Sequence, residues 1–345
     1  MSLAEAIRTR DVSKLPGRRD EDWRWTDLRG LIRQAPEPSP PLAADALGPG
    51  PFAGLAARTL VIANGRGEAA VEIAADEVLA LEVLSQGAGA HAAELSLSVA
   101  PGVRLTLLES YRGEGGYLAH TRLALRLGEG AEVERIVLAE EDAEAVAVSQ
   151  AEVELAPHAR FAQTTLTAGA RRQRLETRVS HPGGQAGLRL DGVYLLAGKR
   201  HADLTTAVEH RGHEGATDQL TKGVVRDQAR GVFQGRIVVA EGADRTEARM
   251  GHHALILSDR AEVDAKPELE IYADDVACAH GNTIGALDEE ALFYARQRGI
   301  PDAEARALLT EAFIGEVLDR ISHEGARDAA RAWAARSLAA DGSKG

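Results

Sequence analysis

The sequence predicts a mainly β protein whose strands stack as a solenoid, with helical segments before and after them. Three observations support this fold class. Apolar and polar residues alternate from Leu60 to Ile271, a small-residue turn recurs about every 28 residues, and helical periodicity is confined to the two ends of the chain.

The recurring turn is the strongest of these observations. It keeps one phase at Gly102-Val103, Gly130-Ala131, His158-Ala159, Ala186-Gly187, Glu214-Gly215 and Gly242-Ala243. A second set of strand residues recurs out of phase with it, at Thr121, Ser149, Thr177 and Thr205. Repeats of two strands and two turns cannot bury a face alone and must stack on their neighbours. A β-helix is therefore the expected architecture, and a large β-sandwich is its main competitor.

The N-terminal region, residues 1–51, is expected to be a small helical domain followed by a linker. Residues 2–15 show a short helical pattern that stops at Pro16-Gly17, and a second helix is predicted from Asp22 to Gln34. Its tryptophans, Trp23 and Trp25, are expected to pack against the next domain. Residues 36–51 hold six of the twelve prolines, which predicts an extended linker before a β-helix core over residues 52–286.

A helical C-terminal domain is expected over residues 287–345. Asp288 is a suitable N-cap, Gly299 is placed to end the helix, and Pro301 can begin the next one. Apolar residues at helical spacing then continue to the end of the chain, as the stripe Leu308, Leu309, Ala312, Phe313, Val317 and Ile321 and the later residues Ala329, Trp333 and Leu338.

Composition limits the classes of function. The 345 residues include 40 basic and 53 acidic side chains, a net charge of -13, which argues against a nucleic-acid partner. Neither a signal peptide nor a membrane span is predicted, so a cytoplasmic location is expected. The single cysteine excludes an all-cysteine iron–sulfur site within one chain.

Cys278 and His280 are the candidate metal ligands. In an extended segment they share one face, and Ala279 points to the other. Thiolate and imidazole suit zinc, copper or iron, but such a site needs about three or four ligands, so the pair is half a site. The alternative is that Cys278 is a buried apolar residue and His280 a hydrogen-bonded turn residue.

Other motifs are weaker. His210, His213 and Glu214 lie close together but have no fourth ligand near them, and His252 and His253 would point to opposite faces of a strand. The glycine-rich segment 192–199 has the wrong spacing for a phosphate loop, and neither a G-x-S-x-G nor an H-E-x-x-H motif is present.

Two segments resemble a known family. The sequence LEIYADDVACAHGNTIGALDEEALFYARQRGI, residues 269–300, resembles the C-terminal signature of the SufD family of the SUF iron–sulfur cluster assembly machinery. GRRDEDWRWTDL, residues 17–28, resembles the N-terminal signature of the same family. Family members often carry serine where this chain has Ala279, which faces away from the cysteine–histidine pair.

The resemblance implies a right-handed parallel β-helix that acts as a scaffold rather than an enzyme. It implies pairing with SufB through the edge of the β-helix and binding of the ATPase SufC, whose ATP-driven closure would open the shared interface. Cys278 and His280 would hold iron or a cluster transiently at the SufB interface, with no tightly bound cofactor. The residues matching the SufC-docking helices are Asp288, Glu289, Glu290, Leu292, Phe293, Tyr294, Leu308 and Phe313.

Three alternatives remain open from the sequence. A SufB-like paralogue is one, although several cysteines would be expected of it. A β-helix enzyme acting on polysaccharides and an adaptor without metal chemistry are the others. Whether the isolated chain is a monomer or a homodimer, and whether a flavin takes part, is also left open.

Overall fold

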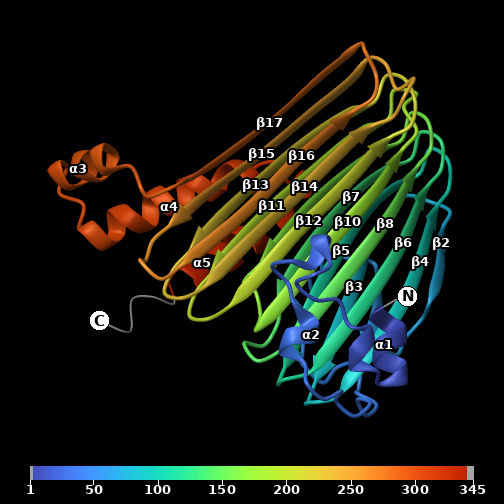
Figure 1. Ribbon diagram of the computed structural model, residues 1–345, viewed down its shortest axis with the longest axis horizontal. Helices are drawn as coiled ribbons and strands as arrows, with labels where there is room; N and C mark the ends of the chain where they lie inside the picture. Colours follow the sequence, from blue (N-terminus) through green and yellow to red (C-terminus); the bar gives the residue numbers. More distant parts are fainter. Residues whose placement is uncertain (1–2, 340–345) are drawn as a thin grey trace.

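The chain winds through two parallel β-sheets, which it visits alternately (Figure 1). The computed structural model describes residues 3–339. The nine-stranded sheet contains β1 (Arg58–Ala63), β3 (Glu77–Gln86), β5 (Arg104–Glu114), β7 (Glu132–Glu140), β9 (Arg160–Thr167), β11 (Gly187–Leu196), β13 (Ala216–Val225), β15 (Thr246–Ile256) and β17 (Val276–Gly285). The eight-stranded sheet contains β2 (Ala70–Ile73), β4 (Ala90–Val99), β6 (Leu118–Leu127), β8 (Val146–Leu155), β10 (Arg172–His181), β12 (His201–His210), β14 (Arg230–Val239) and β16 (Glu262–Ile271). The predicted parallel solenoid is confirmed.

The recurring turn forms one corner of each coil. Its residues have left-handed backbone conformations at Gly102 (φ 70°), Gly130 (65°), His158 (61°), Glu214 (59°) and Gly242 (78°). Successive corners are tied by backbone hydrogen bonds, such as the one from the Gly102 N–H to the Glu129 carbonyl at 2.9 Å. Glycine recurs here because it adopts this conformation without steric cost.

The second predicted repeat does not keep its register. Thr121 pairs with Ser149 as expected, but Ser149 pairs with Leu175 rather than with Thr177. Thr177 in turn pairs with Thr206, the neighbour of the predicted Thr205. The connections on this side differ in length from coil to coil, so a fixed spacing cannot describe the pairing.

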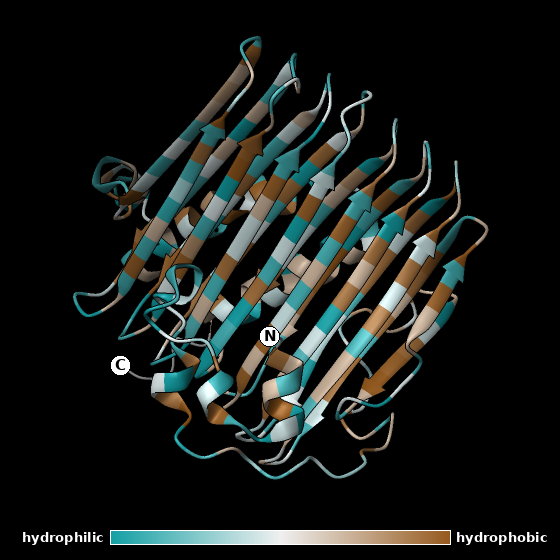
Figure 2. Cartoon of the chain, turned by 45° about the vertical axis from the view of Figure 1, so that its right-hand side comes forward, coloured by the Kyte–Doolittle hydropathy of each residue, from teal (hydrophilic) through white to brown (hydrophobic). Residues whose placement is uncertain are grey.

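The main core lies between the two sheets. Alternate side chains point inward, and they form one apolar cluster that extends from Leu60 in β1 to Ala261 before β16. Figure 2 shows the corresponding alternation of hydrophobic and hydrophilic residues along the strands. Successive side chains of a strand alternate between the buried inner face and the outer face, and this alternation is the physical basis of the period-two pattern.

The N-terminal segment lies on the outer face of the eight-stranded sheet, as α1 (Leu3–Thr9), the 3-10 turns η1 (Val12–Lys14) and η2 (Glu21–Trp23), and α2 (Leu28–Leu31). Leu3 and Leu28 pack there against Leu118 and Val148. The predicted helix from Asp22 to Gln34 is wrong, because only two separate turns form. Side chains and carbonyls of this segment bond to the sheet instead of completing a helix.

A buried ionic cluster anchors this segment. Arg174 and Asp203, both fully buried, are joined at 2.9 Å between Nη1 and Oδ2. The Thr26 hydroxyl donates to Asp203 Oδ2 at 2.5 Å, and Arg174 donates to the Asp22 carbonyl at 2.6 Å. The Trp23 ring lies 4.5 Å from the Arg174 guanidinium carbon. Trp23 therefore packs against the solenoid, as predicted.

We expect the substitution Asp203→Ala to destabilise the fold by about 3–5 kcal/mol, because it removes one partner of a buried charge pair. The measurement is the urea unfolding midpoint. Arg122→Ala is the matched control, since Arg122 and Glu152 form an exposed ion pair on the same sheet and should contribute less than about 1 kcal/mol. Equal effects of the two substitutions would contradict this account.

The C-terminal helices are α3 (Glu289–Gln297), α4 (Asp302–Leu318) and α5 (Glu324–Ala339). The predicted cap is confirmed, because Asp288 Oδ1 accepts from the Glu290 N–H at 2.8 Å, and Gly299 ends the first helix at φ 86°. In α4 and α5, Ile314 and Trp333 pack on the outer face of the nine-stranded sheet. Figure 1 shows α3 projecting beyond the sheets. No helix within residues 3–339 is both long and apolar enough to cross a membrane.

Candidate functional site

Within residues 3–339, the last coil of the solenoid is formed by β16 and β17, and no further coil stacks on it (Figure 1). Most of β17 is exposed, and β16 is half-buried along almost its whole length. Large apolar side chains are exposed at this open end: Ile271 is 43% exposed, Tyr272 63% and Ile284 42%. Exposed apolar groups beside an unpaired strand edge are typical of an interaction surface.

The two strands at the open end, β16 and β17, differ in how well their free edges can pair with another strand. Glu262 donates its N–H to the carbonyl of Ala229, just before β14, and Tyr272 donates its N–H to that of Val239, the last residue of β14. In a parallel strand, successive residues alternate sides, so the backbone nitrogen of Pro267 is on the side facing away from β14. Proline has no N–H, and it interrupts that row of donors. β17 contains no proline, so the row of backbone N–H donors along its free edge is complete.

Cys278 and His280 are brought to the inner face of β17, as the alternation predicted. Cys278 is in register with Ala248 of β15 and His280 with Met250, and both of these partners belong to the interior cluster. Ala279 lies opposite Arg249 and faces outward. Cys278 is half-buried against the core, whereas His280 is exposed.

The pair is chemically incomplete. Burial raises the pKa of the Cys278 thiol, so a metal would have to displace its proton. His280 makes no hydrogen bond to the described part of the chain. Within residues 3–339, no group of three or more histidine, cysteine or acidic side chains could hold a metal ion. Cys278 and His280 are therefore fewer than the three or four ligands that zinc or iron usually takes.

The other histidine candidates do not form a site. His210 is buried and bonds to the Thr217 hydroxyl at 2.9 Å, and its ring lies tilted by 33° against that of His181 with the centroids 4.3 Å apart. His213 is an exposed turn residue whose Nδ1 lies 3.9 Å from an oxygen of Asp244. The two histidines therefore do not converge.

The predicted partner-binding residues divide into exposed and structural groups. Phe293 and Tyr294 on α3 are 59% and 60% exposed, and Leu308 on α4 is 48% exposed. Leu292 is fully buried in the cluster with Leu287 and Ala305, so its side chain is not part of the exposed surface. Phe313 is half-buried beneath the Lys222 ammonium, 4.5 Å from the ring centroid.

The acidic residues at the start of α3 have a different role from its apolar ones. Asp288 is occupied as the N-cap, and Glu289 and Glu290 are exposed in the first turn of the helix. Together with Phe293 and Tyr294 they line a shallow groove. This exposed surface therefore combines carboxylates with two aromatic rings.

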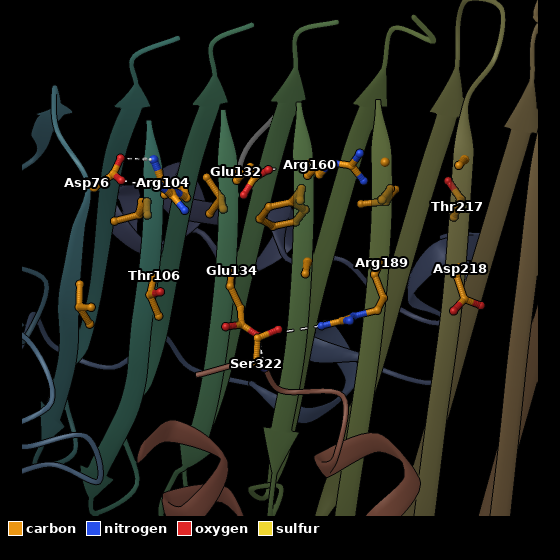
Figure 3. Close-up of a pocket in the computed structure, with 18 of the residues that line it drawn as sticks. Asp76, Arg104, Thr106, Glu132, Glu134, Arg160, Arg189, Thr217, Asp218 and Ser322 are labelled. Carbon is orange, nitrogen blue, oxygen red and sulfur yellow. Dashed lines mark hydrogen bonds and ion pairs between the residues drawn. The ribbon is translucent and has the colours of Figure 1, made fainter. Parts of the chain in front are cut away.

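A hollow of about 1240 Å³ was not predicted from the sequence (Figure 3). It lies on the outer face of the nine-stranded sheet, next to Ser322 in the turn between α4 and α5. Its first row of charges, Asp76, Arg104, Glu132 and Arg160, crosses β5, β7 and β9 in register. The recurrence of Arg104, Glu132 and Arg160 at the turn spacing was the available signal. This hollow is on the face opposite Cys278 and His280.

Comparisons with known proteins place the chain in a family. Residues 83–313 match the family model described as SUF system FeS cluster assembly, SufBD core domain. The chain is 32% identical to iron-sulfur cluster assembly protein SufD of Escherichia coli over 66% of this chain and 55% of that protein. It is 33% identical to a SufBD family protein of Synechocystis over 56% of this chain and 43% of that protein.

The matched region thus spans about half the length of these two relatives. A SufBD family protein of Mycobacterium leprae is 26% identical over 90% of this chain and 88% of its own length. The family match contains the open-end strand with Cys278 and His280, and also α3 and most of α4. The chain therefore belongs to the SufBD family of the SUF iron–sulfur cluster assembly system.

Proposed function

We propose that this chain is a non-catalytic SufD-like scaffold that supplies half of an iron–sulfur assembly site at the open end of its solenoid. The observation that carries the proposal is the placement of Cys278 and His280 on the inner face of β17, the last strand. The two ligands are held 2 residues apart on one edge, and the missing ligands have to come from a partner. Iron and sulfide are then cargo of the assembled site rather than a resident cofactor.

The partner proposed for this edge is SufB, a homologous solenoid. Its strand would pair with β17, whose backbone donors are complete, more readily than with β16, where Pro267 interrupts them. The exposed apolar side chains Ile271, Tyr272 and Ile284 would be covered by the same contact. A homodimer through this edge is the expected form of the isolated chain.

The second partner proposed is the ATPase SufC, on the surface formed by α3 and α4. Phe293 and Tyr294 present aromatic rings on a helix that projects from the sheets, and such anchors commonly dominate binding energy. α4 is fastened to the nine-stranded sheet by Lys222 and Glu316, 2.5 Å apart. Movement of docked ATPase subunits would therefore be transmitted to the last coils. There it would shift the SufB interface between two alternative arrangements.

Two alternatives receive less support. A polysaccharide-active enzyme would use the outer-face hollow, but Phe161, the one aromatic residue among the described residues of its lining, is 1% exposed and belongs to the core, so it offers a sugar ring no surface to stack on. A SufB-like role is disfavoured by the single cysteine. We also propose that the protein is cytoplasmic and that its coils have the right-handed sense usual for parallel β connections.

Co-expression of the tagged chain with SufB and SufC tests both contacts. The wild type is expected to retrieve both partners. Ile284→Lys, which places a charge on the open edge, should lose SufB at least about tenfold and keep SufC. Phe293→Ala with Tyr294→Ala should lose SufC by a similar factor and keep SufB. A wild-type chain that retrieves neither partner would refute the proposed function.

A further inference from the structure

A chain of three polar side chains crosses the solenoid interior and ends beside His280. Tyr194 on β11 is fully buried, and its hydroxyl lies 2.9 Å from His252 Nε2. His252 on β15 is also fully buried, and its Nδ1 lies 2.7 Å from Asn282 Oδ1 on β17. The Phe233 ring stacks on the imidazole at 4.7 Å with an interplanar angle of 2°. The imidazole is therefore held in one plane and at both nitrogens.

The hydrogen bonds in this chain have one direction. An amide oxygen only accepts, so His252 Nδ1 carries the proton and donates to Asn282. Burial lowers the pKa of His252 to about 4, so the ring is neutral at pH 7 and its Nε2 accepts from the Tyr194 hydroxyl. Donation runs from Tyr194 through His252 to Asn282, toward the open end of the solenoid.

Asn282 is left with a free donor. Its oxygen is engaged by His252, so its NH2 group lies on the side of the amide away from that ring, and this group has no partner among residues 3–339. Asn282 follows Cys278 and His280 at intervals of two residues, so all three share the inner face of β17. An exposed asparagine at a strand edge is ordinarily free to rotate, whereas this one has its orientation set from the interior.

We propose that Asn282 is a third group of the Cys278 and His280 site and donates its N–H to sulfide or thiolate sulfur bound there. Sulfur anions accept such bonds, and hydrogen bonds to the sulfurs tune iron–sulfur clusters. His252 and Tyr194 are positioning residues in this scheme, because they orient the amide without contacting the bound group. The inference rests on the proposed function, since it requires a sulfur-bearing occupant.

The test uses the co-purified complex with SufB and SufC, loaded anaerobically with ferrous iron and sulfide. Asn282→Asp keeps an oxygen that accepts from His252 but replaces the N–H donor with an anionic oxygen. Asn282→Ala removes both interactions. A donor role predicts that Asn282→Asp loses more bound iron and sulfide than Asn282→Ala, with at least about a tenfold loss for Asn282→Asp. A merely structural role predicts the reverse order.

Tyr194→Phe provides a second readout, because it removes only the first hydrogen bond of the chain and leaves the donor in place. It should lower iron and sulfide content less than either substitution of Asn282. If the wild-type complex loads, iron and sulfide content in Asn282→Asp equal to or above that in Asn282→Ala would overturn the inference. The proposed function would then still stand. Equal loss of SufB capture by both Asn282 variants would also overturn it, since Asn282 would then be an interface residue only. A wild-type complex that takes up neither iron nor sulfide would refute the proposed function itself.

Discussion

Acidification from pH 6.5 to about pH 4 is expected to unfold the protein, because five buried histidines stay neutral in the fold. Burial lowers their pKa values to about 4 for His91, His181 and His252 and to about 3 for His201 and His210. In the unfolded chain each has a pKa near 6.5. The rings of His181 and His210 also lie with their centroids 4.3 Å apart, so a proton on either would lie beside a neighbouring imidazole in the interior.

The sign follows from the protons bound in each state. Below pH 6.5 the unfolded chain binds protons at these histidines that the folded chain does not, so the free energy of unfolding falls as the pH falls. This loss continues down to the folded pKa values, near 4 and 3. Two carboxyls act in the opposite direction, because burial raises the pKa values of Glu141 and Asp191 to about 7. As the pH falls, these two carboxyls take up protons in the folded state before they do so in the unfolded state, which raises the free energy of unfolding.

The histidines outnumber the carboxyls, so near pH 5.5 unfolding takes up about three protons. The free energy of unfolding should then fall by about 4 kcal/mol per pH unit. Typical domains have only about 5–15 kcal/mol to lose. Unfolding is therefore expected within this window.

Urea unfolding at a series of pH values measures the slope. His210→Leu should reduce it by about one proton, or about 1.4 kcal/mol per pH unit. His213→Leu is the control, because that side chain is 61% exposed and lies in water in both states. A flat profile between pH 6.5 and 4 would show that the buried histidines do not govern stability.

The solenoid was predictable because its signals are local. Corner residues such as Gly102 and Gly130 need a left-handed backbone, and strand faces follow the period-two pattern. The cap at Asp288 was predictable for the same reason. The predicted helix from Asp22 to Gln34 does not form because tertiary interactions replace it: Thr26 bonds to Asp203, a residue 177 positions away.

The site was only partly predictable. Alternation placed Cys278 and His280 on one face, but it could not show that β17 is the last strand of its sheet. The role of Asn282 depends on its register with His252 across two strands, and this register follows from connection lengths that vary along the chain. Likewise, the exposure of Phe293 and the burial of Leu292 depend on how α3 packs on α4.

Loss of the Cys278 and His280 ligands is expected to abolish iron–sulfur loading without disrupting the complex. His280 is exposed and makes no hydrogen bond within residues 3–339, and Cys278 is only half-buried at the last strand. Cys278→Ser and His280→Ala should therefore still retrieve SufB and SufC. Removing one ligand from a site of three or four should lower bound iron by at least about tenfold.

His253→Ala is the matched control. His253 lies on β15, the strand adjacent to β17, but it points to the outer face, where its Nδ1 lies 2.6 Å from the Thr283 hydroxyl. Its removal should leave iron loading within about twofold of the wild type, because it is on the wrong side of the sheet for the proposed site. Loss of iron from this variant as well would indicate damage to β17 rather than loss of a ligand.

The most direct measurement is the iron and acid-labile sulfide content of the anaerobically purified complex, compared between the wild type and His280→Ala. A shared site at the open end predicts iron and sulfide in the wild-type complex and at least about a tenfold loss in the variant, with SufB and SufC still bound. Equal iron and sulfide in the two intact complexes would contradict the assignment of the site to β17.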